Sequence, residues 1–127
     1  MGASGLGTLQ YTGTGHTSNR VINITNGTGT IEASGSGTLI LSGGITAPNR
    51  PLNLAGTGLA VESGVIAIGS GTVTKNNAGT WSLSGANTYT GTTTIIAGIL
   101  SINTLQSVNG GASSLGAPTT STNGTIA

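Results

Sequence analysis

Apolar and small polar residues alternate along this chain in a short phrase that recurs many times. The phrase begins with Gly-Thr, runs through alternating apolar and polar positions, and ends at Ser-Gly or an equivalent pair. Clear copies are GTLQYTG at 7–13, GTIEASG at 29–35, GTLILSG at 37–43 and GTWSLSG at 79–85. Degenerate copies are GLAVESG at 58–64 and GTVTKNNAG at 71–79. Such alternation predicts short β-strands, and a repeated strand-and-turn unit must stack on its neighbours to bury its apolar face.

Two longer similarities support a repeat. NRVINI at 19–24 returns as NRPLNL at 49–54, an offset of 30, and Glu32 returns as Glu62 at the same offset. SGTLILSGGIT at 36–46 returns as AGTWSLSGANT at 78–88, an offset of 42. Offsets that differ between elements indicate similar strands joined by loops of variable length, which favours a β-helix over a globular sandwich.

The pattern predicts strands and no helix, because Gly or Asn interrupts every stretch of helical length. The predicted strands are 7–11, 21–24, 28–33, 38–41, 52–54, 59–62, 65–68, 72–74, 80–83, 92–96, 99–102 and 124–126. We place Leu41 and Ile95 in interior phases. Residues 106–122 lack a clear pattern and are predicted to form a protruding loop.

These strands predict a single all-β domain over residues 1–127, a parallel β-solenoid of about five coils with about 20 to 30 residues each. Phrases at 5–9 and 123–127 open strands without a polar cap, so we expect uncapped ends. The chain would then approximate one period of a longer array. Its partner would be itself, in a covalent tandem or by head-to-tail stacking, which does not close and gives a filament.

The composition changes the expected source of stability. Charged residues are 4% of the 127 residues, against about 25% in ordinary domains, and the chain has 24 Gly, no Cys and no Phe. Its core must therefore use Val, Ile, Leu, Ala and Thr, and its stability must depend on backbone ladders and stacked side chains.

With a net charge of +1 and no basic cluster, we expect no nucleic-acid binding. No apolar run approaches bilayer length and the first residues, MGASGLGTLQ, do not form a signal peptide, so we expect no membrane insertion and an export signal elsewhere.

Candidate chemistry is sparse. His16 has no Cys or Asp to accompany it, so we expect a turn residue and predict no metal and no cofactor. Glu32 and Glu62 could form a glycosidase pair, but repetition explains their positions better. Arg20 and Arg50 would repeat with them as exterior, charge-compensating positions. Lys75 is expected at a solvated edge or corner.

The asparagine and aromatic residues of the repeated phrases are expected to have mainly structural roles. Asn23 and Asn53 are expected to be stacked corner residues whose amides hydrogen-bond along the rod. Trp81 and Tyr89 could form a platform for a surface glycan, although Trp81, which replaces Leu39 at its equivalent position, is more simply a strand residue. No catalytic residue is predicted.

The stretch GTWSLSGANTYTGTTTIIAGILSIN at 79–103 resembles the autotransporter-associated β-strand repeat, whose usual form is G-T-L-x-L-S-G-x-N-T-Y-T-G-x-T-x-I-x-x-G-T-L. It departs from that form at Trp81 and Ile99. The matching residues are Gly79, Thr80, Leu83, Ser84, Gly85, Asn87, Thr88, Tyr89, Thr90, Gly91, Thr93, Ile95, Gly98 and Leu100. The tract at 7–43 is similar to sequences found between such repeats. The resemblance implies a right-handed parallel β-helix in the exported passenger of a bacterial surface or secreted protein, in which the repeat is a scaffold and carries no catalytic residue.

Three functions remain open at this point. The first is a non-catalytic structural element, such as an extracellular stalk, matrix or filament. The second is an adhesin segment that binds a glycan or host surface through Trp81, Tyr89 or the 106–122 loop. The third and weakest is a polysaccharide lyase or hydrolase, since the chain has no Asp and few Lys and Arg.

Overall fold

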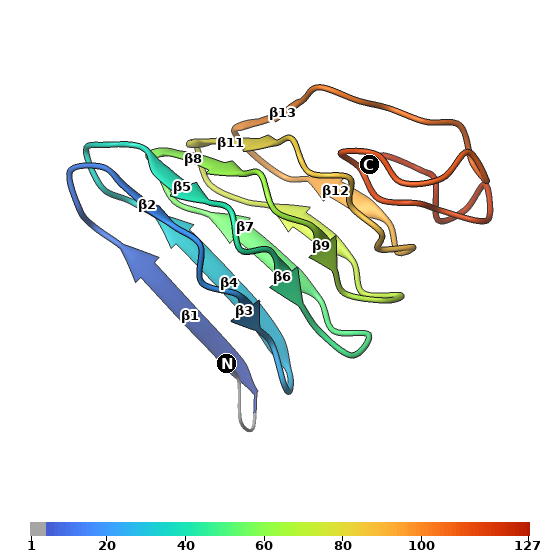
Figure 1. Ribbon diagram of the computed structural model, residues 1–127, viewed down its shortest axis with the longest axis horizontal. Helices are drawn as coiled ribbons and strands as arrows, with labels where there is room; N and C mark the ends of the chain where they lie inside the picture. Colours follow the sequence, from blue (N-terminus) through green and yellow to red (C-terminus); the bar gives the residue numbers. More distant parts are fainter. Residues whose placement is uncertain (1–4) are drawn as a thin grey trace.

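The computed structural model describes residues 5–127, which form a parallel β-solenoid (Figure 1). Sheet A contains β1 (Leu6–Tyr11), β4 (Thr28–Ala33), β7 (Leu52–Ala55), β10 (Val73–Lys75) and β12 (Thr93–Ile95). Sheet B contains β2 (His16–Ser18), β5 (Leu39–Leu41), β8 (Leu59–Glu62), β11 (Thr80–Leu83) and β13 (Ile99–Ile102). Sheet C contains β3 (Ile22–Asn23), β6 (Ile45–Thr46) and β9 (Ile66–Ala67).

Each coil contributes one strand to sheet A and one to sheet B, and all strand pairs are parallel. In sheet A, Leu6 pairs with Thr28, Gly29 with Leu52, Leu52 with Val73 and Val73 with Thr93. The coils are therefore nearly equal in length, at the short end of the predicted range. The predicted all-β solenoid of about five coils is confirmed. The described part of the chain contains no helix, and therefore none that could cross a membrane.

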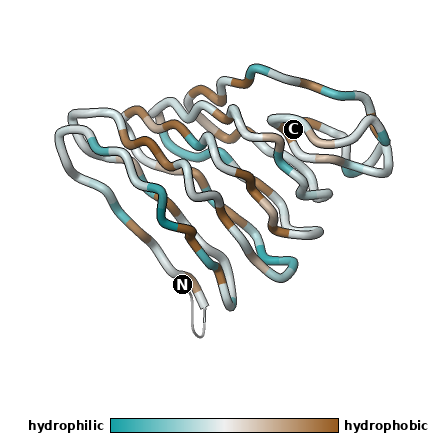
Figure 2. The backbone as a smooth tube through the Cα atoms, viewed as in Figure 1, coloured by the Kyte–Doolittle hydropathy of each residue, from teal (hydrophilic) through white to brown (hydrophobic). Residues whose placement is uncertain are grey.

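The alternating sequence explains which side chains enter the core. In β4, Ile31 and Ala33 point inward and are buried, whereas Thr30 and Glu32, which alternate with them, are partly exposed. The same phase on successive coils stacks inward residues into columns, and Figure 2 shows hydrophobic stretches recurring from coil to coil. Burial of each column depends on the coil above and below it, because a single coil of short strands encloses little apolar area.

The strand predictions agree closely with the structure. Those at 28–33, 59–62, 80–83 and 99–102 are confirmed to the residue. The sequence analysis missed β2 and β6, whose short sequences, HTS and IT, carry too little alternation to detect. Of the predicted strand at 124–126, the structure has a single parallel bridge between Ile126 and Thr93.

One of the two repeat offsets is correct. Leu39 pairs with Ala60 and Ala60 with Trp81, so the offset of 42 spans two coils. The offset of 30 is wrong as a coil repeat. Glu32 lies on β4 of sheet A, whereas Glu62 lies on β8 of sheet B. Similar short phrases form strands of different sheets in this chain. A sequence alignment can therefore match a strand of one sheet to a strand of another.

The same error affects the two arginines. Arg20 lies between β2 and β3, and Arg50 lies between β6 and β7, so the two occupy different corners of the coil. They are therefore not equivalent positions of successive coils.

The segment after β13 completes the fifth coil and begins another rung. The backbone N–H of Asn87 donates to the carbonyl of Ser113 at 2.9 Å, and that of Ala117 donates to the carbonyl of Tyr89 at 2.8 Å. Residues 113–116 are buried by this packing, whereas residues 109–112 and 119–122 are exposed. The interval predicted to protrude thus holds two exposed stretches on either side of a docked one. Figure 1 shows this C-terminal segment folded against the last coils.

The outermost coils keep the inward phase, but among residues 5–127 neither has a complete coil on its outer side. Leu9, Ile31, Leu54, Lys75 and Ile95 are in register in sheet A. Ile31 and Leu54 are fully buried, whereas Leu9 is 47% exposed and Ile95 is 38% exposed. Ile95 was placed in the right phase, but its predicted burial is wrong because it belongs to the last complete rung of sheet A.

Candidate functional site

The phrase GTWSLSGANTYTG at 79–91 forms β11 and the two corners that follow it, in the fourth coil. Trp81 lies in the inward column of sheet B with Leu39, Ala60 and Leu100. Its large ring is next to the small side chain of Ala60, which leaves room for it. The sequence predicts a structural role for this phrase, with Trp81 and Tyr89 as the alternative ligand contacts.

Both aromatic rings of the phrase are completely buried, which confirms the simpler prediction that Trp81 is a strand residue and contradicts the alternative of a glycan platform. Trp81 and Tyr89 each have 0% exposure. The indole Nε1 of Trp81 donates to the carbonyl of Ala55 at 2.9 Å, and the hydroxyl of Tyr89 pairs with Oγ1 of Thr93 at 2.8 Å. Burial raises the pKa of Tyr89 to about 12, although the bond to Thr93 opposes the shift. Both rings are therefore core side chains with satisfied polar atoms.

Asn87 acts as a buried amide link between coils. Its Oδ1 accepts from the backbone N–H of Ile66 at 2.8 Å, and its Nδ2 donates to the carbonyl of Ser114 at 2.7 Å. The side chain has 0% exposure. It therefore joins β9 to the docked C-terminal segment at a place where sheet C has no strand of the fourth coil.

The glycines of the phrase allow close contact between corners. A Cβ on Gly79 would meet the carbonyl oxygen of Gly58, one on Gly85 would meet that of Gly64, and one on Gly91 would meet that of Gly71. The obstacles are backbone atoms, which cannot move aside as a flexible side chain could. These positions need Gly because of the spacing between coils.

Thr80 and Thr88 of the phrase do not form a site with these glycines. Thr80 is partly exposed on β11, and Thr88 is exposed, with its backbone N–H bonded to the carbonyl of Ile66 at 3.1 Å.

The predicted stack of Asn23 and Asn53 is wrong. Asn23 lies on β3 and pairs with Thr46, whereas Asn53 lies on β7 in a different sheet. The Nδ2 of Asn53 donates to Oγ1 of Thr30 at 3.4 Å, on the outer face of sheet A. Both residues belong to strands and not to corners, because their similarity came from the misleading offset of 30.

The two carboxylates have opposite environments. Glu32 faces outward, where its Oε1 accepts from Ser34 at 2.6 Å and from Gln10 at 2.8 Å, and these bonds lower its pKa. Glu62 points into the core and is fully buried. A glycosidase pair needs both carboxyl groups beside one substrate, so these residues do not form one.

The expectation that Glu62 is an exterior position is also wrong. In the phrase GLAVESG it occupies the place of Leu41 in GTLILSG and of Leu83 in GTWSLSG. An alignment of those three phrases predicts that the carboxyl group of Glu62 points inward. The similarity at an offset of 30 obscured this prediction because it matched Glu62 to the outward Glu32.

Lys75 was predicted at a solvated edge, but it is fully buried. Its Nζ donates to the carbonyls of Asn76 at 2.7 Å, Asn77 at 2.8 Å and Ala97 at 3.1 Å. Burial lowers its pKa. The ammonium group thus uses its three donors to close the corner between sheets A and B and to link it to the next coil.

His16 is exposed on β2, where its Nδ1 lies 3.4 Å from the hydroxyl of Tyr11. Residues 5–127 contain no cluster of three or more His, Cys, Asp or Glu side chains that could hold a metal ion.

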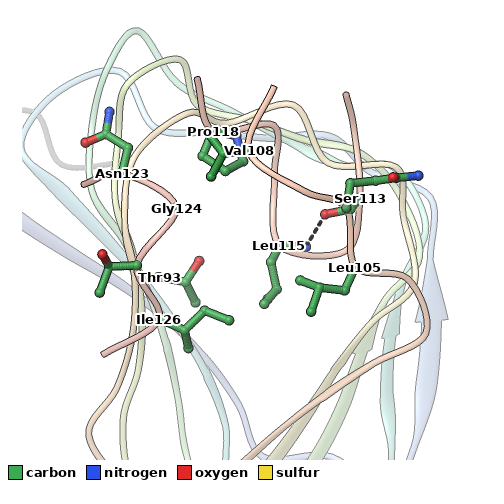
Figure 3. Close-up of a pocket in the computed structure, with 11 residues that line it drawn as sticks. Thr93, Leu105, Val108, Ser113, Leu115, Pro118, Asn123, Gly124 and Ile126 are labelled. Carbon is green, nitrogen blue, oxygen red and sulfur yellow. Dashed lines mark hydrogen bonds between the residues drawn. The ribbon is translucent and has the colours of Figure 1, made fainter. Parts of the chain in front are cut away.

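Two hollows lie at the ends of the solenoid. A cavity of about 30 Å³ between the last coil and the C-terminal segment is bordered by Thr93, Leu105, Leu115 and Ile126, and Ser113 Oγ accepts there from the N–H of Leu115 (Figure 3). It has room for a water or two and is too small for an organic ligand. At the other end, a hollow of about 390 Å³ is lined by residues of the first two coils, among them the polar Gln10, Ser18 and Arg20. Its apolar lining is Leu9, Tyr11, Val21, Ile22, Ile31, Leu39 and Leu41.

Comparison with known proteins gives this arrangement a family context. The passenger-associated-transport-repeat model matches residues 31–47 and 73–102. The chain carries autotransporter passenger repeats. The second match begins on β10 and ends with β13, so it contains the buried Trp81, Asn87 and Tyr89.

The chain is also 40% identical to the adhesin BmaC autotransporter of Brucella suis biovar 1 (strain 1330), over 75% of this chain and 3% of that protein. The chain thus spans a very small part of the length of this relative. No solved structure matches the chain.

Proposed function

We propose that this chain is a non-catalytic structural segment of a bacterial surface or extracellular protein, in which it extends a β-solenoid stalk. The observation that carries the proposal is the unbroken ladder of parallel strands through sheets A and B. Its polar, aromatic and glycine positions serve contacts between coils, as Asn87, Lys75 and Gly79 do. Passenger repeats and similarity to an autotransporter support export to the cell surface.

End-to-end contact with another copy is part of this proposal. At the N-terminal end, β1 is paired on one side by β4, and Leu9 and Tyr11 border the apolar hollow. At the other end, Ile126 pairs with Thr93 as the first step of a further rung. The backbone N–H of Ile95 donates to the carbonyl of Ala127 at 2.7 Å, which continues the same ladder. These features support stacking, because a further coil would pair by the same parallel hydrogen bonds that join coils inside the molecule.

Sedimentation velocity over a concentration series tests this contact. We expect concentration-dependent association of the wild-type chain and its loss in Leu9→Glu, which places a charge in the hollow. Thr74→Glu adds the same charge to the outer face of β10, away from both ends, and is expected to associate like wild type. A monomeric wild-type chain at high concentration, or equal association of both variants, would contradict end-to-end stacking.

A second candidate is an adhesive segment, which the relative's name as an adhesin favours. Since Trp81 and Tyr89 are buried, the contact would fall on the exposed stretches at 109–112 and 119–122. A glycan array probed with the labelled chain separates the two candidates. The structural proposal predicts no specific signal, whereas a signal that disappears when the four hydroxyl residues at 119–122 are replaced by Ala would establish adhesion.

A further inference from the structure

Glu62 is an ionisable side chain in an inward column that elsewhere carries mainly apolar residues. It ends β8 and is in register with Leu41 on one side and Leu83 on the other. Ser18 and Ile102 extend the column to the first and last coils. Glu62 has 0% exposure, as buried as its aliphatic neighbours.

The carboxyl group of Glu62 is only half satisfied. Its Oε1 accepts from the backbone N–H of Gly64 at 2.8 Å. Its Oε2 is buried and has no hydrogen-bond partner. A buried carboxylate is stable in a protein when cations or several donors surround it, and one backbone donor is a weak substitute.

No charge faces this carboxyl from the elements packed against it. The flanking strands β5 and β11 contribute Leu41 and Leu83 to its column, and neither strand contains a titratable residue. The corner after β8 is Ser63, Gly64 and Val65, none of which is titratable, and Gly44 of the neighbouring coil lies beside Gly64.

The other titratable side chains of the described residues have contacts or positions elsewhere. Lys75 donates to carbonyls at the opposite corner, Glu32 bonds to Gln10 and Ser34, Tyr89 bonds to Thr93, and Tyr11 lies beside His16. Arg20 lies in the turn after β2, and Arg50 precedes β7.

We propose that Glu62 makes the cohesion of the second, third and fourth coils depend on pH, with tighter packing when its carboxyl group is protonated. The neutral acid resembles the leucines above and below it in having no charge to solvate. The carboxylate places an uncompensated charge between two leucine side chains. Its loss of solvation weakens the coil that contains it and both neighbours.

The sign of the effect follows from burial. Burial raises the pKa of Glu62 to about 7, against an ordinary value of 4.5, although the Gly64 bond opposes the shift. Between these two values the folded chain holds a proton that the unfolded chain releases. Stability therefore falls as pH rises from about 4.5 and levels off above about 7.

Carbon-13 NMR of the carboxyl groups provides the direct test, because the chain contains two Asp and Glu residues in total, Glu32 and Glu62. We expect one side-chain carboxyl resonance to titrate in the acidic range and the other near neutrality. Glu62→Gln should remove the near-neutral resonance and Glu32→Gln the acidic one. Titration of both resonances in the acidic range would overturn the proposal.

Thermal unfolding tests the consequence. We expect the wild-type melting temperature to fall by about 5 to 10 °C between pH 5 and pH 8.5. Glu62→Gln and Glu62→Leu should remove this slope and melt above wild type at pH 8.5. Leu occupies the same position of the column in the two adjacent coils. Gln keeps an oxygen that can accept from the N–H of Gly64, so it serves as the test if Glu62→Leu does not fold.

Two controls separate Glu62 from the other groups that titrate. Glu32→Gln changes the outward-facing carboxyl group. His16→Gln removes the single histidine of the chain, and histidine is a residue type that ordinarily titrates near neutrality. Both variants should keep the wild-type slope between pH 5 and pH 8.5. A wild-type slope that persists in Glu62→Gln, or that disappears in His16→Gln, would overturn the proposal.

Discussion

The side-chain amide of Asn87 accepts a hydrogen bond from the backbone of Ile66 at 2.8 Å, across one coil. Sheet C ends at β9, so the N–H of Ile66 would otherwise have no strand beside it. The other end of the amide reaches the carbonyl of Ser114. One side chain thus performs the pairing that a strand performs elsewhere, which gives the Asn of the NTYTG phrase a physical role.

Replacing Asn87 with Ala should destabilise the fold by about 1 to 3 kcal/mol, because it leaves the buried N–H of Ile66 and carbonyl of Ser114 without their partner. Urea unfolding measures the change. Thr88→Ala, at the adjacent exposed position, should stay within about 0.5 kcal/mol of wild type. Equal losses in both variants would mean that Asn87 has no special role.

Replacing Gly79 with Val should cost about 1 to 3 kcal/mol, because the new Cβ would collide with the backbone carbonyl of Gly58. The matched control is Gly5→Val, since no atom lies within 4 Å of a Cβ at Gly5. Thermal melts of both variants check the difference. An unchanged melting temperature for Gly79→Val would show that corners of adjacent coils can separate at little cost.

The sequence specified the strands well because each lies in a repeated phrase whose alternation reports its inward face. It was less informative about which sheet or corner of the coil each phrase occupies. The similarity between 19–24 and 49–54 matched a corner of one coil to a different corner of another. That error placed Glu62 outside the core, although the shorter phrases set it beside Leu41.

Lys75 was misjudged for a different reason. A charged residue in a Gly- and Asn-rich corner usually lies in solvent. Its burial depends on three carbonyl groups that converge only after adjacent coils stack. The sequence around Lys75 gives no sign of that convergence.

Leu41 and Ile95 should respond differently to truncation, although both point inward. Leu41→Ala is expected to cost about 2 to 5 kcal/mol because its site is 5% exposed between two coils. Ile95→Ala should cost less than about 2 kcal/mol, since Ile95 is 38% exposed on the last rung. Chemical denaturation compares them. A larger loss at Ile95 would indicate that another coil covers it in solution.

Lys75→Met should destabilise the chain by about 1 to 3 kcal/mol. Met retains an apolar stem in the column beside Leu54, but it cannot donate to the carbonyls of Asn76, Asn77 and Ala97. The control is Arg20→Met, which removes a positive charge at an exposed turn and should change little. Unfolding free energies that do not distinguish the two variants would count against the proposed corner closure.

The burial of Trp81 makes a final prediction about both structure and binding. It is the single Trp of the chain, so its fluorescence reports one site. Because its ring has 0% exposure and its Nε1 bonds to Ala55, we expect blue-shifted emission and weak quenching by iodide in the folded state. Unfolding should shift the emission to longer wavelength and make it accessible to iodide. Soluble glycans should leave the folded spectrum unchanged, since a sugar cannot stack on an enclosed ring. Strong quenching in the folded state would place Trp81 at the surface and restore it as a candidate glycan contact.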